Sequence, residues 1–353
     1  MKYGRVLLED VEGYVPGEQP QTADIIKLNT NENPYPPSPR VIEALQSVSV
    51  NALRRYPDPV SLNFRAACAR RYGLPNADWV IAGNGMDEVL AMAVRTFVDP
   101  DDAILTTYPT YTLYETLAQL HGAHIVEVDL DENFQLPEAF FETPARLVFL
   151  TRPNAPTGVA VPKGAVERLC ESFDGIVFLD EAYVDFADAH CLDLVQQYDN
   201  LIVGRSFSKS YSLAGMRLGI GVAQPAIIDE FLKTKDSYNM NAVAQRVGKA
   251  AIEDAATLEA NTARIRATRG RVTNALTELG FEVPESQANF LFAQWKGSPS
   301  AKTLFESLRD RGIFVRYFNA RRLDHALRIS IGTDAEMDAL LTALGEMIAP
   351  VRA

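Results

Sequence analysis

Six short apolar runs, separated by helical patterns, constrain the fold of this chain more than any other feature of its sequence. Several of the runs are apolar at successive positions, which is typical of strands that are covered on both faces. Strands of this kind that alternate with helices predict an α/β domain with a mainly parallel sheet. Ligands of such sheets bind beyond the carboxyl ends of the strands. The runs are residues 79–82, 103–105, 124–128, 147–150, 176–179 and 201–204.

The pattern changes on either side of this region. Residues 1–35 are rich in Pro, Gly and Asn and show little periodicity, so we expect an arm that packs on the small domain described next. After a long helix predicted over 255–279, the apolar runs indicate a smaller α+β domain. We therefore divide the chain into an arm at 1–35, a large domain at 36–260 and a small domain at 261–353. The small domain has predicted strands at 281–283, 290–292, 313–315 and 327–331, and predicted helices near 300–310 and over 334–347.

Charge and cysteine content argue against several classes of function. The formal net charge of −12 disfavours nucleic acid as a partner, because binding to a phosphate backbone needs a basic surface. No apolar run is long enough to span a membrane, and the first residues do not have the pattern of a cleaved signal sequence. The 3 cysteines lack CxxC spacing and the 4 histidines are scattered. We therefore expect reduced thiols, no bound metal and a cytoplasmic protein.

The segment around Lys209 carries the residues best suited to covalent catalysis. A lysine amine is protonated at neutral pH and attacks a carbonyl only when it is desolvated or lies near other cations. Lys209 follows an apolar run and has Ser206, Ser208 and Arg217 close in sequence. Two hydroxyls and a guanidinium suit a phosphate dianion. A lone lysine would more simply be a surface residue in a turn, so the interpretation depends on these neighbours.

A second group of residues follows the run at 176–179. Asp180 would be costly to bury there unless it met a cation, and the protonated nitrogen of a pyridine ring is such a cation. Tyr183 is close enough in sequence to reach a hydroxyl on the same ring. An amine nucleophile, a phosphate anchor and a buried carboxylate are together what pyridoxal phosphate requires. Alone, Asp180 would be interpreted as a helix cap and Tyr183 as a packing residue.

Two further loops follow strands in the same half of the chain. Residues 83–88 place glycines directly before a helix, where backbone N–H groups and the helix dipole can hold a phosphate. This segment is neither a complete GxGxxG motif nor a P-loop, and a tight turn with Asp87 as the helix cap is the alternative. Tyr111, after the next run, offers an aromatic face to a planar cofactor, although aromatic residues after a strand more often belong to the core.

Taken in order, these motifs resemble those of the fold-type I, class II pyridoxal-phosphate-dependent aminotransferases, and among them the histidinol-phosphate aminotransferases. The resemblance covers nearly the whole chain, from residues 28–34 and 55–58 to residues 327–333. It implies a large domain with a mainly parallel seven-stranded sheet between helices and a smaller α+β C-terminal domain. It also implies pyridoxal 5'-phosphate as the cofactor, amino and oxo acids as substrates, and a homodimer in which the arm at 1–35 also packs on the partner subunit.

The resemblance implies a cofactor role for each matching residue. Lys209 would be the Schiff-base lysine and would carry a proton between the substrate and the cofactor. Asp180 would pair with the pyridine nitrogen, Tyr183 with the ring oxygen, and Tyr111 would stack on the ring. The cofactor phosphate would be held by Gly85 and Met86 through their backbone N–H groups and by the side chains of Ser206, Ser208 and Arg217.

The same resemblance implies the residues that contact the substrate and the neighbouring subunit. Arg328 would bind the α-carboxylate of an amino or oxo acid, a task that suits the bidentate fork of arginine. Tyr14, Asn31 and Arg316 would line the substrate site. Tyr56 would reach across a dimer interface to the cofactor phosphate of the other subunit.

Two positions depart from the family pattern. The family has an asparagine directly before Pro-Thr-Gly, where it bonds to the ring oxygen of the cofactor, whereas this chain has Ala155 before residues 156–158. Alanine cannot donate that hydrogen bond, so either Asn154 takes its place or Tyr183 acts alone. Met86 replaces a small hydroxyl residue, which has no consequence if only its backbone N–H contacts the phosphate.

These roles predict transfer of the amino group of L-histidinol phosphate to 2-oxoglutarate, giving imidazole-acetol phosphate and L-glutamate, a step of histidine biosynthesis. Arg316 would bind the phosphate of the donor, with an ordinary ion pair on a strand as the alternative. An aromatic-amino-acid aminotransferase is the second hypothesis, and a threonine-phosphate decarboxylase is the third. A cofactor-binding sensor without turnover is disfavoured, because Lys209, Asp180 and Arg328 are all present. The aromatic alternative rests on Tyr14, Tyr56, Tyr238 and Tyr317.

Overall fold

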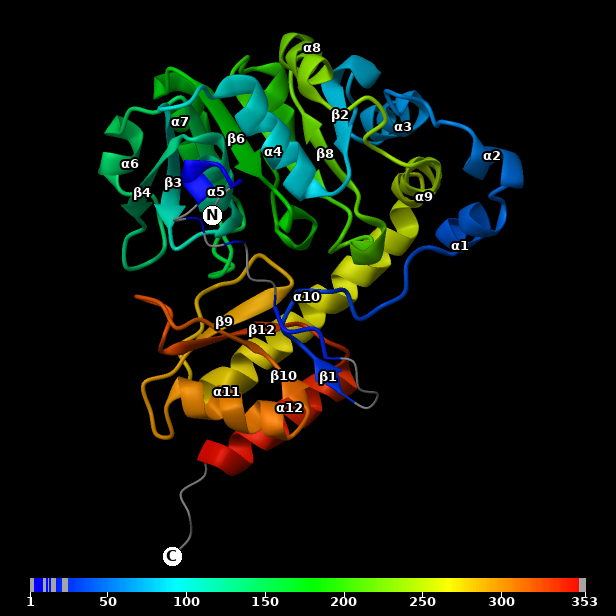
Figure 1. Ribbon diagram of the computed structural model, residues 1–353. Helices are drawn as coiled ribbons and strands as arrows, with labels where there is room; N and C mark the ends of the chain where they lie inside the picture. Colours follow the sequence, from blue (N-terminus) through cyan, green and yellow to red (C-terminus); the bar gives the residue numbers. More distant parts are fainter. Residues whose placement is uncertain (1–2, 9–10, 12, 14–16, 21–24, 349–353) are drawn as a thin grey trace, which may run out of the picture.

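The computed structural model describes residues 3–8, 11, 13, 17–20 and 25–348. Two layered domains are joined by one long helix, α10 (Ala255–Glu278), which runs diagonally between them (Figure 1). No helix in the described part of the chain is long and apolar enough to cross a membrane.

The large domain is built on a seven-stranded sheet with the order β2-β8-β7-β6-β5-β3-β4. The strands from β7 to β4 are parallel to one another, and β8 runs antiparallel to both of its neighbours. The expectation of a mainly parallel sheet of seven strands is confirmed. The strands are β2 (Val80–Gly83), β3 (Ala103–Tyr108), β4 (His124–Asp129), β5 (Leu147–Thr151), β6 (Ile176–Asp180), β7 (Leu201–Ser206) and β8 (Gly219–Val222).

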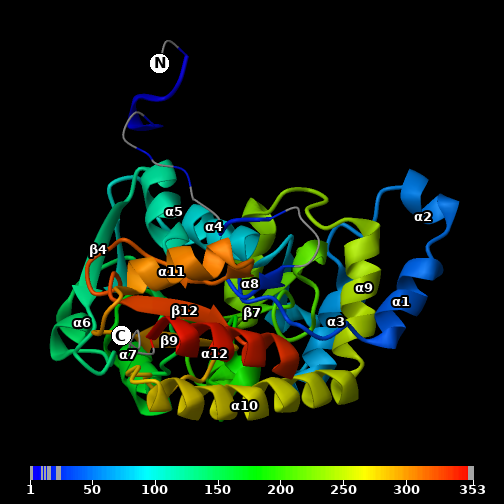
Figure 2. The ribbon, with the colours of Figure 1, turned by 90° about the horizontal axis from the view of Figure 1, so that it is seen from below.

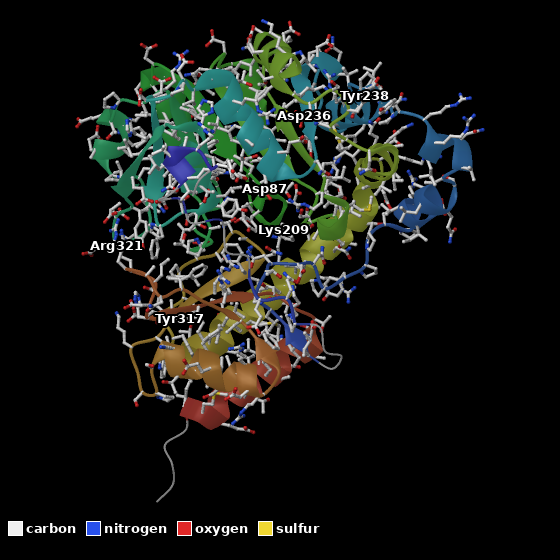
Figure 3. All side chains as sticks on the ribbon, viewed as in Figure 1. Asp87, Lys209, Asp236, Tyr238, Tyr317 and Arg321 are labelled. Carbon is white, nitrogen blue, oxygen red and sulfur yellow. The ribbon has the colours of Figure 1, made fainter. Side chains whose placement is uncertain are left out.

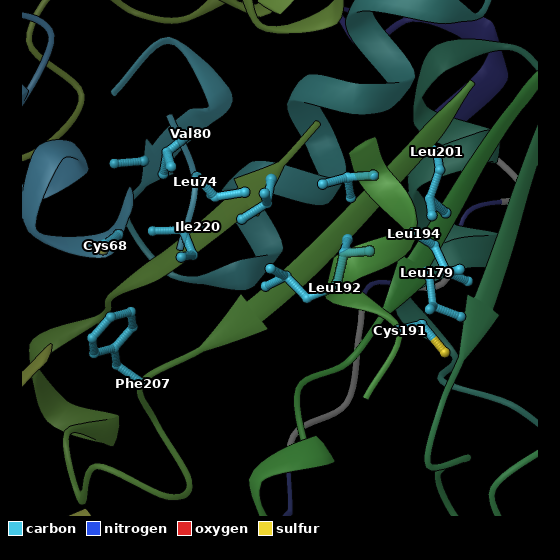
Figure 4. Close-up of a cluster of buried hydrophobic side chains, with 14 of the residues drawn as sticks. Cys68, Leu74, Val80, Leu179, Cys191, Leu192, Leu194, Leu201, Phe207 and Ile220 are labelled. Atoms are coloured by element: carbon cyan, nitrogen blue, oxygen red, sulfur yellow. The ribbon is translucent and has the colours of Figure 1, made fainter. Parts of the chain in front are cut away.

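Helices cover both faces of this sheet, which explains why its strands are apolar at successive positions. Side chains alternate between the faces along a strand, so Phe149 packs in one cluster while Val148 and Leu150 pack in the other. Figure 4 shows part of the second cluster, to which Leu179 of β6 and Ile220 of β8 contribute. The first cluster includes α4 (Met86–Phe97), α5 (Leu113–His121) and α8 (Pro225–Thr234), and the second includes α3 (Leu62–Arg71), α7 (Lys163–Ser172) and α9 (Ala242–Ile252).

Strand β8 was not among the apolar runs, because glycine alternates with apolar residues along it. These glycines have a packing role. A Cβ atom on Gly219 would lie 2.5 Å from the backbone nitrogen of Met86, the first residue of α4. Glycine therefore lets the N-terminus of α4 approach the sheet at the end where the polar motifs lie.

The small domain contains an antiparallel sheet, β11-β12-β9, and a separate parallel pair, β1-β10. The pair joins the arm to the small domain, since the backbone N–H of Leu28 donates to the carbonyl of Phe314 at 2.7 Å. The predicted strand at 281–283 is wrong. Only Glu282 pairs there, in an isolated bridge, because Gly280 has a positive φ and Pro284 has no N–H to continue a ladder. The elements are β1 (Ile26–Lys27), β9 (Phe290–Gln294), β10 (Ile313–Phe314), β11 (Arg316–Tyr317), β12 (Ala326–Ser330), α11 (Ala301–Asp310) and α12 (Asp334–Ile348).

Helix α10 contacts both domains, so the division between residues 260 and 261 falls inside one continuous element. Asn261 donates to the carbonyl of Pro36 at 3.1 Å, and Arg269 donates to the carbonyls of Phe186 and Ala288. The boundary itself stays a proposal. The remaining elements are α1 (Pro39–Gln46), α2 (Val50–Arg54), α6 (Glu138–Glu142) and the short 3-10 turns Val6–Leu8, Ala77–Trp79, Val184–Phe186, Leu192–Gln196 and Ala214–Met216.

Helix α1 begins where the sequence predicts. Ser38 accepts a hydrogen bond from the backbone N–H of Arg40, and Pro39 occupies the first helical position. Helices α1 and α2 then lie at one edge of the molecule, where α1 packs against α9 (Figures 1 and 2).

Candidate active site

A cavity of about 440 Å³ lies at the carboxyl ends of the parallel strands and is closed on its far side by the small domain. Lys209 and Asp87 are on the part of the large domain that faces the small domain (Figure 3). The cavity lies where open α/β sheets bind their ligands. It brings together eleven of the residues predicted for the site, namely Asn31, Met86, Tyr111, Asp180, Tyr183, Ser206, Ser208, Lys209, Arg217, Arg316 and Arg328.

Lys209 lies in the loop after β7 and lines the cavity. Its Nζ atom donates to the carbonyl of Thr30 at 3.1 Å. Desolvation, together with the nearby charges of Arg328 and Arg217, lowers the pKa of Lys209 to about 8, although Glu32 opposes this effect. A lysine with such a pKa has a substantial neutral fraction near pH 8, so its amine can attack a carbonyl carbon.

Asp180 is the last residue of β6 and is buried at the floor of the cavity. Its carboxylate accepts hydrogen bonds from the Tyr114 hydroxyl at 2.8 Å and from the backbone N–H of Ala182 at 3.0 Å. Burial nevertheless raises the pKa of Asp180 to about 6. A cationic N–H group in the cavity would stabilise the charged carboxylate and reverse this effect.

Tyr114 and Asp87 contribute to the site although no role was predicted for either. The hydroxyl of Tyr114 bridges Asp180 and Thr151, with an O···O distance of 2.6 Å to the latter. Asp87 was considered only as a helix cap, but its carboxylate accepts from Arg217 at 2.9 Å and from Tyr111 at 3.2 Å. The sequence contained one signal for Tyr114. It lies three positions after Tyr111, near the start of a helix, and this spacing brings side chains together on one face.

The residues predicted to hold a phosphate form a cradle at the start of α4. Gly85 is the N-cap of this helix with φ of 91°, and no side chain caps it. A Cβ atom on Gly85 would lie 2.6 Å from Nη2 of Arg217, so only glycine lets the guanidinium approach the backbone here. Ser206 and Ser208 line the same cavity as Arg217 and Met86. A helix N-terminus, a guanidinium and two hydroxyls together suit a phosphate dianion.

The small domain contributes two arginines to the opposite wall. Arg316 on β11 and Arg328 on β12 are directly opposite in the strand register. Their guanidinium carbons lie 5.2 Å and 5.4 Å from the centre of the Phe318 ring. Like charges opposite each other on a sheet are unfavourable, so this pair favours an anionic ligand in the cavity.

Tyr183 lies between the lysine and the arm. Asn31 donates from Nδ2 to the Tyr183 hydroxyl oxygen at 3.1 Å, and the Tyr183 ring packs edge-on against Phe290. Nζ of Lys209 lies 5.9 Å from the centre of the same ring. The hydroxyl is therefore held by the arm, while the ring lies near the amine that would react.

The whole arrangement agrees with the comparisons to known proteins. Residues 23–344 match the family model for aminotransferase class I and II. The chain belongs to this family. The aminotransferase is 45% identical over 347 residues to the histidinol-phosphate aminotransferase of Microcystis aeruginosa, covering 98% of each chain. It is also 45% identical over 336 residues to the histidinol-phosphate aminotransferase of Synechocystis sp., covering 95% of each chain.

Solved structures give the same result for the fold. The crystal structure of histidinol-phosphate aminotransferase from Sinorhizobium meliloti in complex with pyridoxal-5'-phosphate superposes with a TM-score of 0.89 and 26% identity. The alignment covers 99% of this aminotransferase and 98% of that chain. The family resemblance and the fold class inferred from the motifs are confirmed.

Asn154 and Tyr56, which were predicted for the site, do not line the cavity of this aminotransferase. Asn154 is buried and donates to the carbonyl of Pro109 at 3.1 Å, and its neighbour Ala155 lines the cavity instead. Tyr56 is 81% exposed and stacks on Tyr238, which lies well apart from Lys209 (Figure 3). Tyr14 lies outside the described residues.

A second cavity, of about 590 Å³, lies between the domains and is lined by Arg152 and several carboxylates, including Glu132 and Glu285. No lysine lines it, so it lacks the nucleophile found beside Asp180. Across the described ranges no group of three or more His, Cys, Asp or Glu side chains is arranged to hold a metal ion.

Proposed function

We propose that this aminotransferase binds pyridoxal 5'-phosphate and transfers the amino group of L-histidinol phosphate to 2-oxoglutarate, giving imidazole-acetol phosphate and L-glutamate. The observation that carries the proposal is the single cavity in which Lys209, Asp180 and the Arg217 cradle all meet. The names of the relatives support it, since the two curated relatives at 45% identity are histidinol-phosphate aminotransferases.

The residues present fit the cofactor at each of its functional groups. Pyridoxal phosphate, when bound, supplies a ring that withdraws electrons from the substrate α-carbon. Arg217 and the start of α4 would hold its phosphate, and Asp180 would accept a hydrogen bond from the pyridine N–H. Tyr183 would donate to the ring oxygen. Tyr111 would pack on the ring face.

Lys209 would carry out both the covalent step and the proton transfer. Its amine is desolvated and has a pKa of about 8, so near neutral pH it can release a proton and accept one back. The Thr30 carbonyl orients the amine from the arm, at 3.1 Å from Nζ. Lys209 would form the covalent link to the cofactor carbonyl with loss of water. Once the substrate amine has displaced it, Lys209 would carry the proton from the substrate α-carbon to the cofactor.

Arg316 and Arg328 would bind the anionic groups of both substrates. The amino donor carries a phosphate, whereas 2-oxoglutarate carries two carboxylates, so the same cationic wall must serve both halves of the reaction. Two guanidiniums on adjacent strands can each form a bidentate contact with a phosphate or a carboxylate. We assign the α-carboxylate to Arg328 and the phosphate of the donor to Arg316.

The alternative of an aromatic amino acid as the main donor has less support in the described structure. Tyr56 and Tyr238 stack on each other at a centroid distance of 4.5 Å, and Tyr317 stacks on Phe305 at 5.7 Å. None of these three tyrosines is among the residues that line the cavity of the same subunit.

A spectral titration of the cofactor-loaded protein tests the substrate. We expect L-histidinol phosphate to convert the band of the lysine-bound cofactor to that of the amine form at far lower concentration than phenylalanine. Arg316→Gln should raise the half-saturating concentration of histidinol phosphate by about tenfold to a hundredfold and leave that of phenylalanine nearly unchanged. Conversion by phenylalanine alone would discard the named substrate, and absence of the lysine-bound band would discard the cofactor assignment.

We also propose a homodimer in which α1 and α2 face the partner subunit. Exposed apolar side chains gather there, with Val50 at 78%, Leu53 at 66% and Tyr56 at 81% exposure. Contiguous apolar surface of this kind is typical of protein–protein contacts. In that dimer Tyr56 would reach the cofactor phosphate of the other subunit, and the arm at 1–35 would contact it as well.

Light scattering tests the dimer. The wild-type protein should have the mass of two chains, and Leu53→Asp should shift it towards the mass of one. Leu120→Asp, at an exposed leucine on α5, is the matched control and should leave the mass unchanged. A wild-type mass of one chain, or equal effects of the two substitutions, would contradict the proposal.

A cytoplasmic location and the absence of a nucleic-acid partner stay predictions. The net charge of −12 supports the second. Cys68, Cys170 and Cys191 are buried free thiols, which supports a reducing compartment.

A further inference from the structure

Four charged side chains form a largely buried ion network at the carboxyl ends of β5, β6 and β7, with only the Asp185 side chain as much as 21% exposed. Arg205 lies 3.1 Å from Glu181 and 3.2 Å from Asp185, and Arg152 lies 3.6 Å from Glu181. The Glu181 side chain is fully buried and the two arginines are 6% exposed. Two positive and two negative charges cancel formally, which is the condition under which such a group can be buried.

Two members of this network, Glu181 and Asp185, are connected to residues of the proposed site. Glu181 directly follows Asp180 along the chain, but it is not among the residues that line the cavity. Asp185 uses one carboxylate oxygen for Arg205 and the other to accept from the Ser210 hydroxyl at 2.5 Å. Ser210 directly follows Lys209. The charged group thus reaches the loop that carries the amine.

The loop at 207–213 depends on contacts with other segments for its conformation. The arm holds one side of it, since Asn33 donates to the carbonyl of Ser210 at 3.1 Å. Ser212, two residues further on, has φ of 59°, which is unfavourable for a residue other than glycine. Its buried hydroxyl has no hydrogen-bond partner among the described residues. Between Ser210 and Ser212, therefore, only Ser210 connects the loop to the ion network through its hydroxyl.

We propose that Asp185 is a positioning residue for the Lys209 amine, acting through the Ser210 hydroxyl while Arg205 holds its carboxylate in place. The inference rests on the proposed role of Lys209 as the amine that binds the cofactor carbonyl. A hydrogen bond to a carboxylate is short and strong, so it can hold a strained loop in one conformation. Small displacements of a reacting group slow a reaction substantially, even when its chemistry is intact.

Cofactor capture by the cofactor-free protein tests this role without measuring turnover. Pyridoxal phosphate is added across a range of pH, the absorbance of the lysine adduct gives the rate, and borohydride reduction followed by mass spectrometry locates the adduct on Lys209. Ser210→Ala should slow capture by about tenfold. Its pH midpoint should also move upward, because an amine that is less firmly held in its desolvated position regains the pKa of an ordinary lysine. Ser212→Ala, in the same loop, should match the wild type in both rate and midpoint.

A second single variant and the double variant test whether the two side chains act through one link. Asp185→Asn preserves shape and should change capture in the same direction as Ser210→Ala, by a smaller factor. The double variant should be no slower than Ser210→Ala alone, because the link is already broken.

The outcomes separate this inference from the proposed function. A wild-type protein that forms no adduct on Lys209 overturns both. A wild-type protein that forms the adduct, together with a Ser210→Ala variant of unchanged rate and midpoint, overturns the positioning role and leaves the cofactor assignment standing. A double variant whose effect equals the product of the single effects also overturns it, since the two side chains would then act separately.

Discussion

Asp180→Asn should stabilise the cofactor-free protein at neutral pH, although it removes the carboxylate that we propose pairs with the cofactor. Burial raises the pKa of Asp180 from 3.8 to about 6 in the folded chain. One pKa unit corresponds to about 1.4 kcal/mol, so this shift of roughly two units amounts to about 3 kcal/mol. Because the folded pKa is raised, this stability is present in full below the unfolded value of 3.8 and is lost as pH rises through about 6.

The asparagine variant does not undergo this loss, since an amide does not titrate. Its amide gives the Tyr114 hydroxyl a neutral acceptor, as the protonated carboxyl of the wild type does at low pH. The two proteins should therefore have similar free energies of unfolding well below pH 3.8. At pH 7.5 the free energy of unfolding of the variant should be about 3 kcal/mol above that of the wild type, and most of this difference should develop between about pH 4 and pH 6.

Urea denaturation of the cofactor-free proteins at pH 4, 5.5 and 7.5 measures this difference. Asp199→Asn, at an exposed carboxylate, is the control and should show no such increase of the difference with pH. With pyridoxal phosphate bound, the order at pH 7.5 should reverse, because the charged carboxylate then pairs with the pyridine N–H. A variant that is less stable than the wild type at pH 7.5 without cofactor, or a difference that does not vary with pH, would refute the assignment of Asp180 as a desolvated carboxylate awaiting a cation.

Three further substitutions test other parts of the site. Lys209→Ala should bind the cofactor without forming the covalent adduct and should lose transamination by at least about a thousandfold, as followed by absorbance and by glutamate formation; substantial turnover would contradict the role of the amine. Arg328→Lys should raise KM for 2-oxoglutarate by about tenfold to a hundredfold through loss of the bidentate contact, with a smaller change in kcat; an unchanged KM would remove the carboxylate assignment. Tyr114→Phe removes a bond that lowers the pKa of Asp180, so in the cofactor-free protein this pKa should rise above about 6, as measured by the pH dependence of unfolding; a lower value would show that the hydroxyl acts otherwise.

Residues whose role follows from their local surroundings were predictable from the sequence. Lys209 and Asp180 each follow an apolar run, and the carboxyl ends of parallel strands meet at one edge of a sheet. The same reasoning reached Gly85, because a glycine before a helix indicates an open N-terminus. The mainly parallel sheet followed from strands that are apolar at successive positions, since helices must cover both of its faces.

Other features depend on contacts between segments that are distant in the sequence. Glycine-rich β8 could not be identified as a strand, because its packing against α4 compensates for its low strand propensity. Tyr114 could not be connected with Asp180, because their contact depends on which helix lies over which strand. The pairing of Arg316 with Arg328 depends on the register of two strands, which hydrophobic patterning does not specify across a hairpin of this length.

The sequence by itself determined which chemical groups this protein has and the ends of which strands carry them, because local hydrophobic patterns and turn residues act over a few positions. Only the tertiary structure decided how those groups are tuned. The lowered pKa of Lys209 and the raised pKa of Asp180 arise from burial and from charges such as Arg328, which comes from the other domain. Electrostatic interactions depend on distance in space and on exclusion of water, and both are set only when the domains pack together.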